Sequence, residues 1–195
     1  LGGWDAHNVT EDADLGFRLA RHGWRTEMIG TVTEEEANCR PLAWVRQRSR
    51  WLKGYMTTYL VHMRRPGRLH AEMGARQFWG FQAHFVSAVS QVLLAPVLWS
   101  FWLLLSGLPH PLEALVPWTV LVLLGSLFLT VEVTNLTIYA VSVAGKRHKH
   151  LLPWVPTMHF YAPLAAFAGY KALYELIFKP FFWDKTAHGL SVAAR

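Results

Sequence analysis

The sequence predicts an α/β segment followed by a transmembrane α-helical hairpin and a helix that lies in the membrane interface. Residues 1–76 alternate between helical and strand-like patterns and carry most of the charge. Residues 77–145 contain no Lys or Arg and only two acidic residues. Residues 146–195 open with a basic loop and continue into an apolar stretch that prolines interrupt. We therefore expect three parts with these boundaries.

The α/β prediction rests on the order helix, strand, helix. Residues 12–22 predict a short helix, because Thr10 can cap it and the acidic residues of its first turn suit the helix dipole. Residues 24–33 are rich in β-branched and alternating residues and predict a strand. Pro41 begins a second helix that runs to about His62. This order is typical of the end of an α/β domain, whose earlier strands we expect outside this chain.

The charge distribution excludes several classes of protein. The chain has 195 residues with a net charge of +6, and residues 1–76 hold 12 of its 19 basic residues. A soluble domain rarely runs for 69 residues with two charges, since its surface must be wetted. A purely soluble globular protein, a disordered chain and a disulfide scaffold are therefore excluded. Cys39 is the single cysteine and fits a reducing compartment.

The chain starts without Met and without a signal-peptide pattern, so we expect a fragment that begins inside a domain. The pI near 9.7 comes largely from basic residues that flank the apolar stretches. Positive charge in those places is explained by a membrane, so we expect no nucleic-acid partner.

Two apolar stretches, about 78–105 and 115–143, each exceed the roughly 20 residues that cross a bilayer. Pro96 predicts a kink in the first. Basic residues precede the first stretch and follow the second, whereas the link at 106–111 has none. By the positive-inside rule both outer flanks lie in the cytoplasm, and the two spans form a hairpin.

The third apolar stretch, 151–178, is broken by three prolines in its first half. Its unbroken part, 164–178, is about 22 Å long as a helix, which is short for a span. Lys179 and Lys185 follow it and would be misplaced outside. We expect an interfacial or re-entrant helix here, with a third span as the alternative.

Glu132 lies with three polar neighbours inside the second predicted span. A carboxyl group at membrane depth is a functional candidate, because it usually faces protein or a water-filled path. The alternative is a helix–helix hydrogen bond without a role in chemistry. The sequence leaves both interpretations open.

Gln47, Arg50, Trp51 and Gly54 are spaced i, i+3, i+4, i+7 on the second predicted helix, which places them on one face. A guanidinium fork suits a diphosphate, an indole offers a flat face to a sugar ring, and an amide can donate and accept. The alternative is an ordinary basic, aromatic helix that touches anionic lipid.

The acidic residues at 11, 12 and 14 allow capping or catalysis. The preceding Gly2-Gly3 is a flexible segment that lets backbone approach a ligand. Asp12 and Asp14 stand at i and i+2, which point apart on a helix, so we reject them as a metal site. The ten His show no metal-ligand spacing, and His148 and His150 read as solvated.

Three motifs together resemble the membrane-bound family 2 glycosyltransferases, which include the cellulose, chitin and hyaluronan synthases. Gly2-Gly3-Trp4-Asp5 and the segment 10–19, with Thr10-Glu11-Asp12, resemble the acceptor-side T/E-E-D segment of that family. Gln47-Arg48-Ser49-Arg50-Trp51 matches its Q-x-x-R-W motif, in the right order and before the apolar stretches. Segment 183–189 resembles a W-x-K-T-x-H-G segment of bacterial members, the alternative being an aromatic membrane anchor. It corresponds less well to the gating loop of cellulose synthases, whose sequence differs.

The resemblance implies a GT-A-type domain and roles for particular residues. Asp12 would be the general base that takes the proton of the acceptor hydroxyl, with Glu11 and Thr10 positioning it. Gln47 and Arg50 would contact the diphosphate or the acceptor, and Trp51 would stack on the acceptor sugar. The residues that would hold the donor's diphosphate are Trp183, Lys185, Thr186 and His188.

The resemblance also implies an inverting transfer from a nucleotide-sugar donor to a polysaccharide or lipid acceptor at the cytoplasmic membrane, of which we favour a polysaccharide. It implies Mg²⁺ or Mn²⁺ at the leaving diphosphate. The family's metal ligands and donor-binding strands precede the T-E-D segment, so we expect them outside this chain and expect the fragment alone to be inactive. The alternative is a non-catalytic membrane module in polysaccharide synthesis or export.

Overall fold

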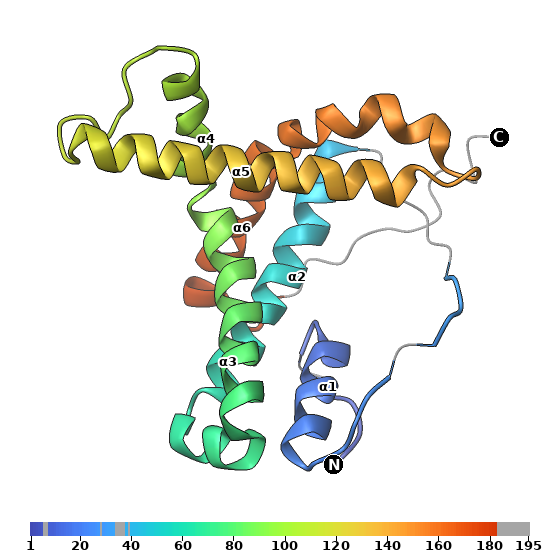
Figure 1. Cartoon of the computed structure of the whole chain (residues 1–195). Coiled ribbons are helices and arrows are strands. Elements are labelled where there is room, and N and C mark those ends of the chain that lie inside the picture. The colour runs from blue at the N-terminus through green and yellow to red at the C-terminus, as the bar shows by residue number, and fades with distance from the viewer. Residues whose placement is uncertain (6–7, 28, 34–37, 39, 183–195) are drawn as a thin grey trace. The chain divides into compact units, whose positions relative to one another are not determined.

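The computed structural model describes the chain except residues 6–7, 28, 34–37, 39 and 183–195. The described residues fold mainly into helices, and Figure 1 labels the α-helices in chain order. Their bounds are α1 Glu11–Arg21, α2 Pro41–His62, α3 Pro66–Leu93, α4 Ala95–Leu105, α5 Trp118–Val143, the 3-10 helix η1 Lys149–Phe160 and α6 Tyr161–Phe178.

The α/β prediction, and with it the GT-A-type domain, is wrong for the described residues, which contain no strand. Residues 24–33 form no regular structure where they are described. A strand needs a neighbour that pairs with its backbone N–H and C=O groups, and no strand pairs with this segment among the described residues. The two helices of this part were predicted well: α1 lies within one residue of 12–22, and α2 runs from Pro41 to His62.

The chain divides into two compact units, which we describe separately. The first unit comprises residues 1–93 and 167–195, and the second comprises residues 94–166.

In the first unit, α1, α2 and α3 pack around an aromatic core. Phe81 and Phe85 of α3 are buried to 1% exposure. Phe17 of α1 meets Phe81 edge-on at 4.9 Å between ring centroids, and Tyr59 of α2 stacks on Phe81 at 5.6 Å. Aromatic pairs of this geometry contribute about 0.5–1.5 kcal/mol each beyond their buried area. Each of the three helices thus contributes rings to one core.

The start of α1 lies directly against α2 because of one glycine. A Cβ atom placed on Gly54 of α2 would lie 2.7 Å from both Cγ2 and Oγ1 of Thr10. Next to this contact, Asn8 Nδ2 donates to Thr58 Oγ1 over 2.7 Å, and Asn8 Oδ1 accepts from the backbone N–H of Thr10. The segment before α1 is therefore fixed to α2 by close packing and by hydrogen bonds.

A group of polar and charged side chains, of which Asp14 and His62 are buried, joins α1 to α2 and α3. Asp14 accepts from Arg18 Nε at 2.7 Å and lies 3.0 Å from His62 Nε2. Arg21 NH1 lies 3.0 Å from His62 Nδ1, and Arg21 Nε donates to Glu72 of α3. Arg21 can only donate, so Nδ1 of His62 accepts and its Nε2–H donates to Asp14. This arrangement requires a neutral imidazole.

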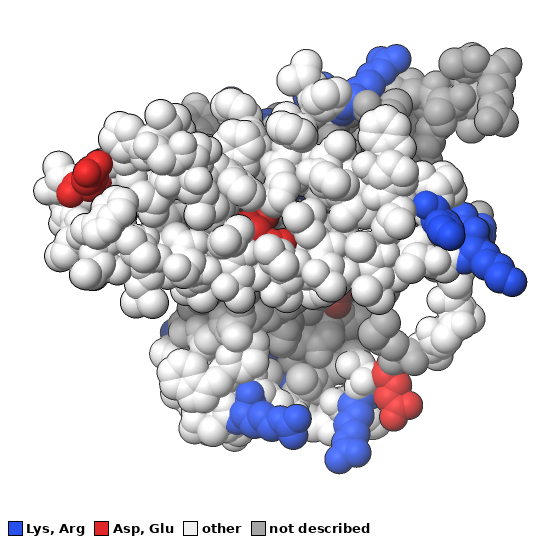
Figure 2. Space-filling view, turned by 45° about the horizontal axis from the view of Figure 1, so that its top comes forward, with Lys and Arg blue, Asp and Glu red and all other residues white. Residues whose placement is uncertain are grey.

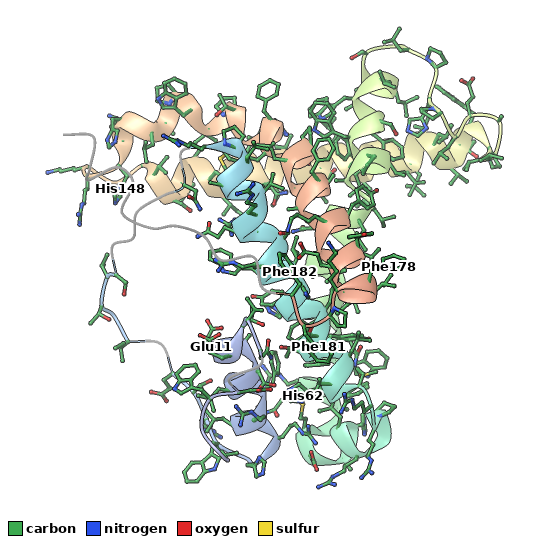
Figure 3. All side chains as sticks on the ribbon, turned by 180° about the vertical axis from the view of Figure 1, so that it is seen from behind. Glu11, His62, His148, Phe178, Phe181 and Phe182 are labelled. Carbon is green, nitrogen blue, oxygen red and sulfur yellow. The ribbon has the colours of Figure 1, made fainter. Side chains whose placement is uncertain are left out.

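Lys53 of α2 fixes the end of α6. Its side chain is buried, and its Nζ donates to the carbonyl oxygens of Lys179 and Phe182 at 2.8 and 2.9 Å. Burial lowers the pKa of Lys53, while Glu175 of α6 opposes this shift. Figure 3 shows Phe178, Phe181 and Phe182 at this end of α6. The last described turn of the chain is thereby held against α2.

In the second unit, Phe101 of α4 packs on Leu121 and Phe128 of α5. Glu132 of α5 lies 2.8 Å from His159 Nδ1 of η1, and the ring of Trp102 meets His159 edge-on at 5.2 Å. The carboxyl group inside the apolar stretch is therefore partnered by η1. Figure 2 shows few charged side chains on the part of the molecule that these elements form.

The predicted hairpin of two spans stays a prediction, because its first span would have to be a bent pair of helices. Among the described helices, α5 is long and apolar enough to cross a membrane, whereas α3 and α4 qualify only if taken together across their bend. The break falls at Leu94, just before Pro96, because proline cannot donate to the preceding turn. The kink was predicted, but it ends the helix and leaves α4 with 11 residues.

The third apolar stretch begins as η1, in which Pro153 and Pro156 lie, and continues as α6. Helix α6 starts three residues before the predicted 164. It is not among the described helices that are long and apolar enough to span, so an interfacial or re-entrant helix and a third span both stay predictions.

We expect Gly54→Ala to destabilise the first unit by about 1–3 kcal/mol, because the new methyl group overlaps a buried Thr10 that is hydrogen-bonded in place. Gly16→Ala is the matched control, since nothing lies within 4 Å of a Cβ atom on this helical glycine. The control should be neutral or stabilising. The measurement is the unfolding midpoint of both variants, and a neutral Gly54→Ala would contradict the close contact.

We expect the free energy of unfolding to fall as the pH drops below about 6.5, the ordinary pKa of histidine. Burial lowers the pKa of His62, with Asp14 opposing and Arg21 and Arg18 reinforcing the shift. Below pH 6.5 His62 binds a proton in the unfolded chain but stays neutral in the folded chain, because its pKa is lower there. Lower pH therefore favours unfolding.

Denaturant titrations between pH 5 and 7.5 measure this slope, and His62→Gln should reduce it. Arg21 and Arg68 lower the pKa of Glu72 to about 2, so its own contribution is lost only below about pH 4.5, outside this window. An unchanged slope in His62→Gln would contradict the assignment.

Candidate functional site

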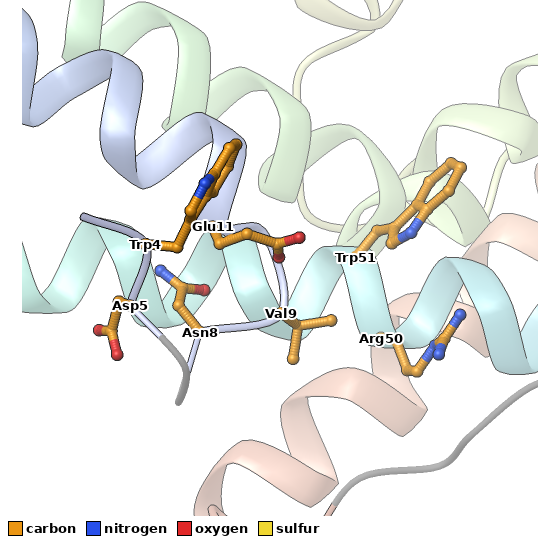
Figure 4. Close-up of a pocket in the computed structure, with 7 residues that line it drawn as sticks. All are labelled: Trp4, Asp5, Asn8, Val9, Glu11, Arg50 and Trp51. Carbon is orange, nitrogen blue, oxygen red and sulfur yellow. The ribbon is translucent and has the colours of Figure 1, made fainter.

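A pocket of about 530 Å³ lies between the segment before α1 and the exposed face of α2. Figure 4 shows it from close by, with all of its lining residues labelled. These residues are Trp4, Asp5, Asn8, Val9, Glu11, Arg50 and Trp51.

Helix α2 contributes Arg50 and Trp51 to this pocket. Adjacent residues on a helix diverge by about 100°, so the two side chains reach different parts of the pocket. The guanidinium group of Arg48 lies 4.5 Å from the ring centroid of Trp51, and the ring is 37% exposed. This cation–π contact orients the indole and covers part of its surface.

The segment before α1 forms the opposite wall. Glu11 is the first residue of α1, and Figure 4 shows its carboxylate between the indoles of Trp4 and Trp51. Asn8 is 6% exposed, and its amide is engaged by Thr58 and by the backbone of Thr10. Asn8 therefore shapes the wall, while Glu11 presents a carboxylate to the space within it.

The structure brings together three of the residues that the sequence singled out. Glu11 of the T-E-D triplet shares the pocket with Arg50 and Trp51 of Q-x-x-R-W. Thr10 does not line the pocket but is buried against Gly54.

Asp12 and Gln47 are not among the lining residues. The side chain of Asp12 is exposed, and its Oδ1 accepts from the backbone N–H of Ala13 at 2.8 Å. Gln47 is partly buried, one turn before Arg50 on α2.

Thr10 occupies the predicted N-cap position of α1, but its side chain makes no capping hydrogen bond. Its hydroxyl lies 3.3 Å from Asn8 Oδ1 and 3.5 Å from Thr58 Oγ1. The predicted cap is therefore wrong, because the tertiary contact with α2 takes the hydroxyl away from the helix end.

Trp183, Lys185, Thr186 and His188 lie outside the described residues. The turn that precedes them is described, and Lys53 holds its carbonyl groups next to α2. Lys53 follows Trp51 by two residues on the same helix.

The described residues include no group of three His, Cys, Asp or Glu side chains that could hold a metal ion. The acids nearest the pocket, Asp5 and Glu11, therefore do not form a chelating set with a third ligand. The described residues around the pocket therefore supply no complete ligand set for a divalent cation.

Sequence reasoning missed Trp4, Asp5, Asn8 and Val9 as lining residues. Trp4 and Asp5 belong to the Gly2-Gly3-Trp4-Asp5 motif, so the sequence already marked them as candidates. Asn8 is held in place by its hydrogen bond to Thr58, which is 50 residues away in the sequence. No local sequence pattern predicts a contact of this kind.

Guanidinium, carboxylate and two indoles around one open space suit a ligand that combines a sugar ring with phosphate. The guanidinium binds phosphate oxygens through a planar fork, and the carboxylate accepts from hydroxyl groups. Indole rings offer flat apolar surface with a negative face.

Comparisons with known proteins find relatives that match a part of the chain. A segment of 65 residues is 35% identical to a beta-monoglucosyldiacylglycerol synthase of Synechocystis sp., which is 33% of this chain and 14% of that protein. Segments of 79 residues are 34% identical to the enzymes of the same name from Trichormus variabilis and Nostoc sp., covering 40% of this chain and 16% of each relative. The aligned part is thus a small fraction of these relatives' length.

No solved structure matches the chain significantly. The model of the family described as glycosyl transferase family group 2 matches residues 1–169, which is most of the chain. The match covers both walls of the pocket and helices α1 to α5. The chain therefore belongs to glycosyl transferase family group 2.

Proposed function

We propose that this chain is part of a membrane-associated, inverting glycosyltransferase that moves a sugar from a nucleotide-sugar donor to a lipid or polysaccharide acceptor. The observation that carries the proposal is the shared pocket of Glu11, Arg50 and Trp51. Residues from two motifs about 40 positions apart meet there, as a common substrate would require.

The proposed step is a single displacement. The oxygen of an acceptor hydroxyl attacks the anomeric carbon, the bond from that carbon to the diphosphate oxygen breaks, and a carboxylate takes the hydroxyl proton. The resemblance assigns the base to Asp12, whereas Glu11 is the carboxylate that lines the pocket. A base must come within about 3 Å of the hydroxyl in the reactive complex. The acceptor would therefore reach past the rim of the pocket toward the exposed Asp12.

Arg50 would bind the diphosphate, which gains negative charge as the bond breaks. Gln47 would support the same group from the preceding turn of α2. Trp51 would stack on a sugar ring with the part of its indole that Arg48 leaves uncovered.

The names of the relatives favour a diacylglycerol-type lipid acceptor over a polysaccharide. Helix α5 is consistent with this acceptor, since it is long and apolar enough to cross a membrane. A lipid acceptor is confined to the membrane, so an enzyme anchored in the membrane meets it more often. The activity assay described below also tests a polysaccharide acceptor.

Mg²⁺ or Mn²⁺ remains part of the proposal through the family resemblance alone. We expect its ligands to lie outside the described residues, and the cation would neutralise charge on the leaving diphosphate.

We expect Asp12→Asn to lower turnover at least a hundredfold, because a positioned general base contributes about 10²–10⁴ in rate. The assay uses the full-length protein in membranes and measures nucleoside diphosphate release from a panel of nucleotide sugars, with diacylglycerol or an oligosaccharide as acceptor. Glu11→Gln is tested beside it, and Glu113→Gln, an exposed acid of the second unit, is the control.

A hundredfold loss in Glu11→Gln together with normal turnover in Asp12→Asn would move the base to Glu11 and leave the function intact. Absence of turnover by the wild type with every donor would reject the transferase and favour a non-catalytic module.

We expect chelation by EDTA to reduce turnover at least a hundredfold, and addition of Mg²⁺ or Mn²⁺ to restore it, since charge stabilisation by a metal is worth several kcal/mol. EDTA saturated with Mg²⁺ controls for effects of the chelator itself. Turnover that persists in EDTA would remove the cation from the proposal.

A further inference from the structure

Trp4 is the most exposed of the aromatic residues that line the pocket. Its side chain is 61% exposed, against 37% for Trp51. Figure 4 shows the two indoles on either side of Glu11. Since Arg48 already stacks on Trp51, Trp4 offers the larger area of indole to a ligand.

The surroundings of Trp4 suit a sugar ring better than a purely apolar ligand. The C–H groups on one face of a pyranose carry partial positive charge and are attracted to the negative face of an indole. The hydroxyl groups at the ring's edge need acceptors, and Glu11 provides them within the same pocket.

Trp4 belongs to no helix, so its position depends on tertiary contacts. Arg18 of α1 donates from NH1 to the carbonyl oxygen of Leu1 and from NH2 to that of Gly3, both at 2.7 Å. The planar guanidinium thus bridges two carbonyl groups within the three residues that precede Trp4. A lysine ammonium is a single point, so it cannot place donors at the three separate positions from which Nε, NH1 and NH2 of Arg18 reach Asp14, Leu1 and Gly3.

The backbone of Gly2 and Gly3 makes this bridge possible. Their φ angles are +76° and +74°, in the left-handed region that residues with a side chain rarely adopt. The two glycines turn the chain so that both carbonyl oxygens reach Arg18.

The side chain of Arg18 is in turn held in place by Asp14. Its Nε donates to Asp14, and Asp14 is 5% exposed and lies 3.0 Å from His62 of α2. A chain of contacts therefore runs from the core of the first unit to the pocket wall: His62, Asp14, Arg18, Gly3, Trp4.

We propose that Trp4 is a second aromatic platform for a pyranose ring in this pocket, and that Arg18 is the positioning residue that holds it there. The inference rests on the proposed function. The ring belongs either to the transferred hexose or to a glycosylated acceptor, and the kinetics of the two substrates separate these sources.

The test measures KM and kcat of the full-length enzyme for donor and acceptor separately. Trp4→Ala should raise KM for the substrate that stacks about tenfold with little change in kcat, as expected for loss of a contact present before and during the reaction. A rise for the donor identifies the hexose, and a rise for the acceptor identifies its sugar. Trp4→Phe should keep KM near the wild-type value.

Arg18→Lys should raise KM for the same substrate. In the double variant Trp4→Ala/Arg18→Lys the rise should be no larger than in Trp4→Ala alone, because residues that act through one contact are not additive. Trp24→Ala is the matched control, since Trp24 is 65% exposed and does not line the pocket.

Unchanged KM for both substrates in Trp4→Ala would overturn the platform while leaving the transferase intact. Additive effects in the double variant would overturn the role of Arg18.

A second readout works without turnover. Saturation-transfer NMR with methyl hexosides, in a detergent that lacks sugar, should show ring contacts in the wild type that Trp4→Ala loses. If the wild type transfers no sugar but shows this loss, the proposed function fails and the platform stands. If neither turnover nor NMR depends on Trp4, the platform fails.

Discussion

The close approach of Thr10 to Gly54 is the constraint on which the site depends. A side chain at position 54 would push the start of α1 away from α2, since its first carbon would lie 2.7 Å from Thr10. Without this contact Glu11 would leave Arg50 and Trp51, and the pocket would lose one wall. The glycine in this part of α2 therefore serves the site rather than helix stability, for which any other common residue except proline is better.

Buried charges hold the arrangement in one register. Asp14 serves two partners at once, Arg18 on its own helix and His62 on α2. Lys53 satisfies two carbonyl groups beyond the end of α6. Burying such groups costs free energy that only well-placed partners offset, so a shifted helix would leave unpaired charges. Apolar contacts tolerate sliding better, which explains why these charges specify the geometry around the pocket.

The second unit is organised around apolar helices and an ion pair rather than around a group of buried charges. Its longest helix, α5, exposes apolar side chains along its length and pairs its one acid with His159 of η1. In an apolar stretch a lone carboxylate would be costly, and a nearby imidazole reduces that cost. The sequence left two interpretations open for Glu132, a functional carboxyl group or a hydrogen bond between helices. The structure shows a partner on a neighbouring helix, His159 of η1, as the second interpretation requires.

The sequence by itself determined the helices α1 and α2, the apolar character of α5, the interruption near Pro96 and the family. These features depend on local patterns: first-turn acids, proline positions, runs without charge and motif spacing. The strand at 24–33 was wrong because strands need partners that no local pattern supplies. Only the tertiary structure decided which motif residues meet. Glu11 and Trp4 reach Arg50 and Trp51 through Gly54, Thr58 and Arg18, and contacts between residues 15 to 50 positions apart leave no periodic signal in the chain.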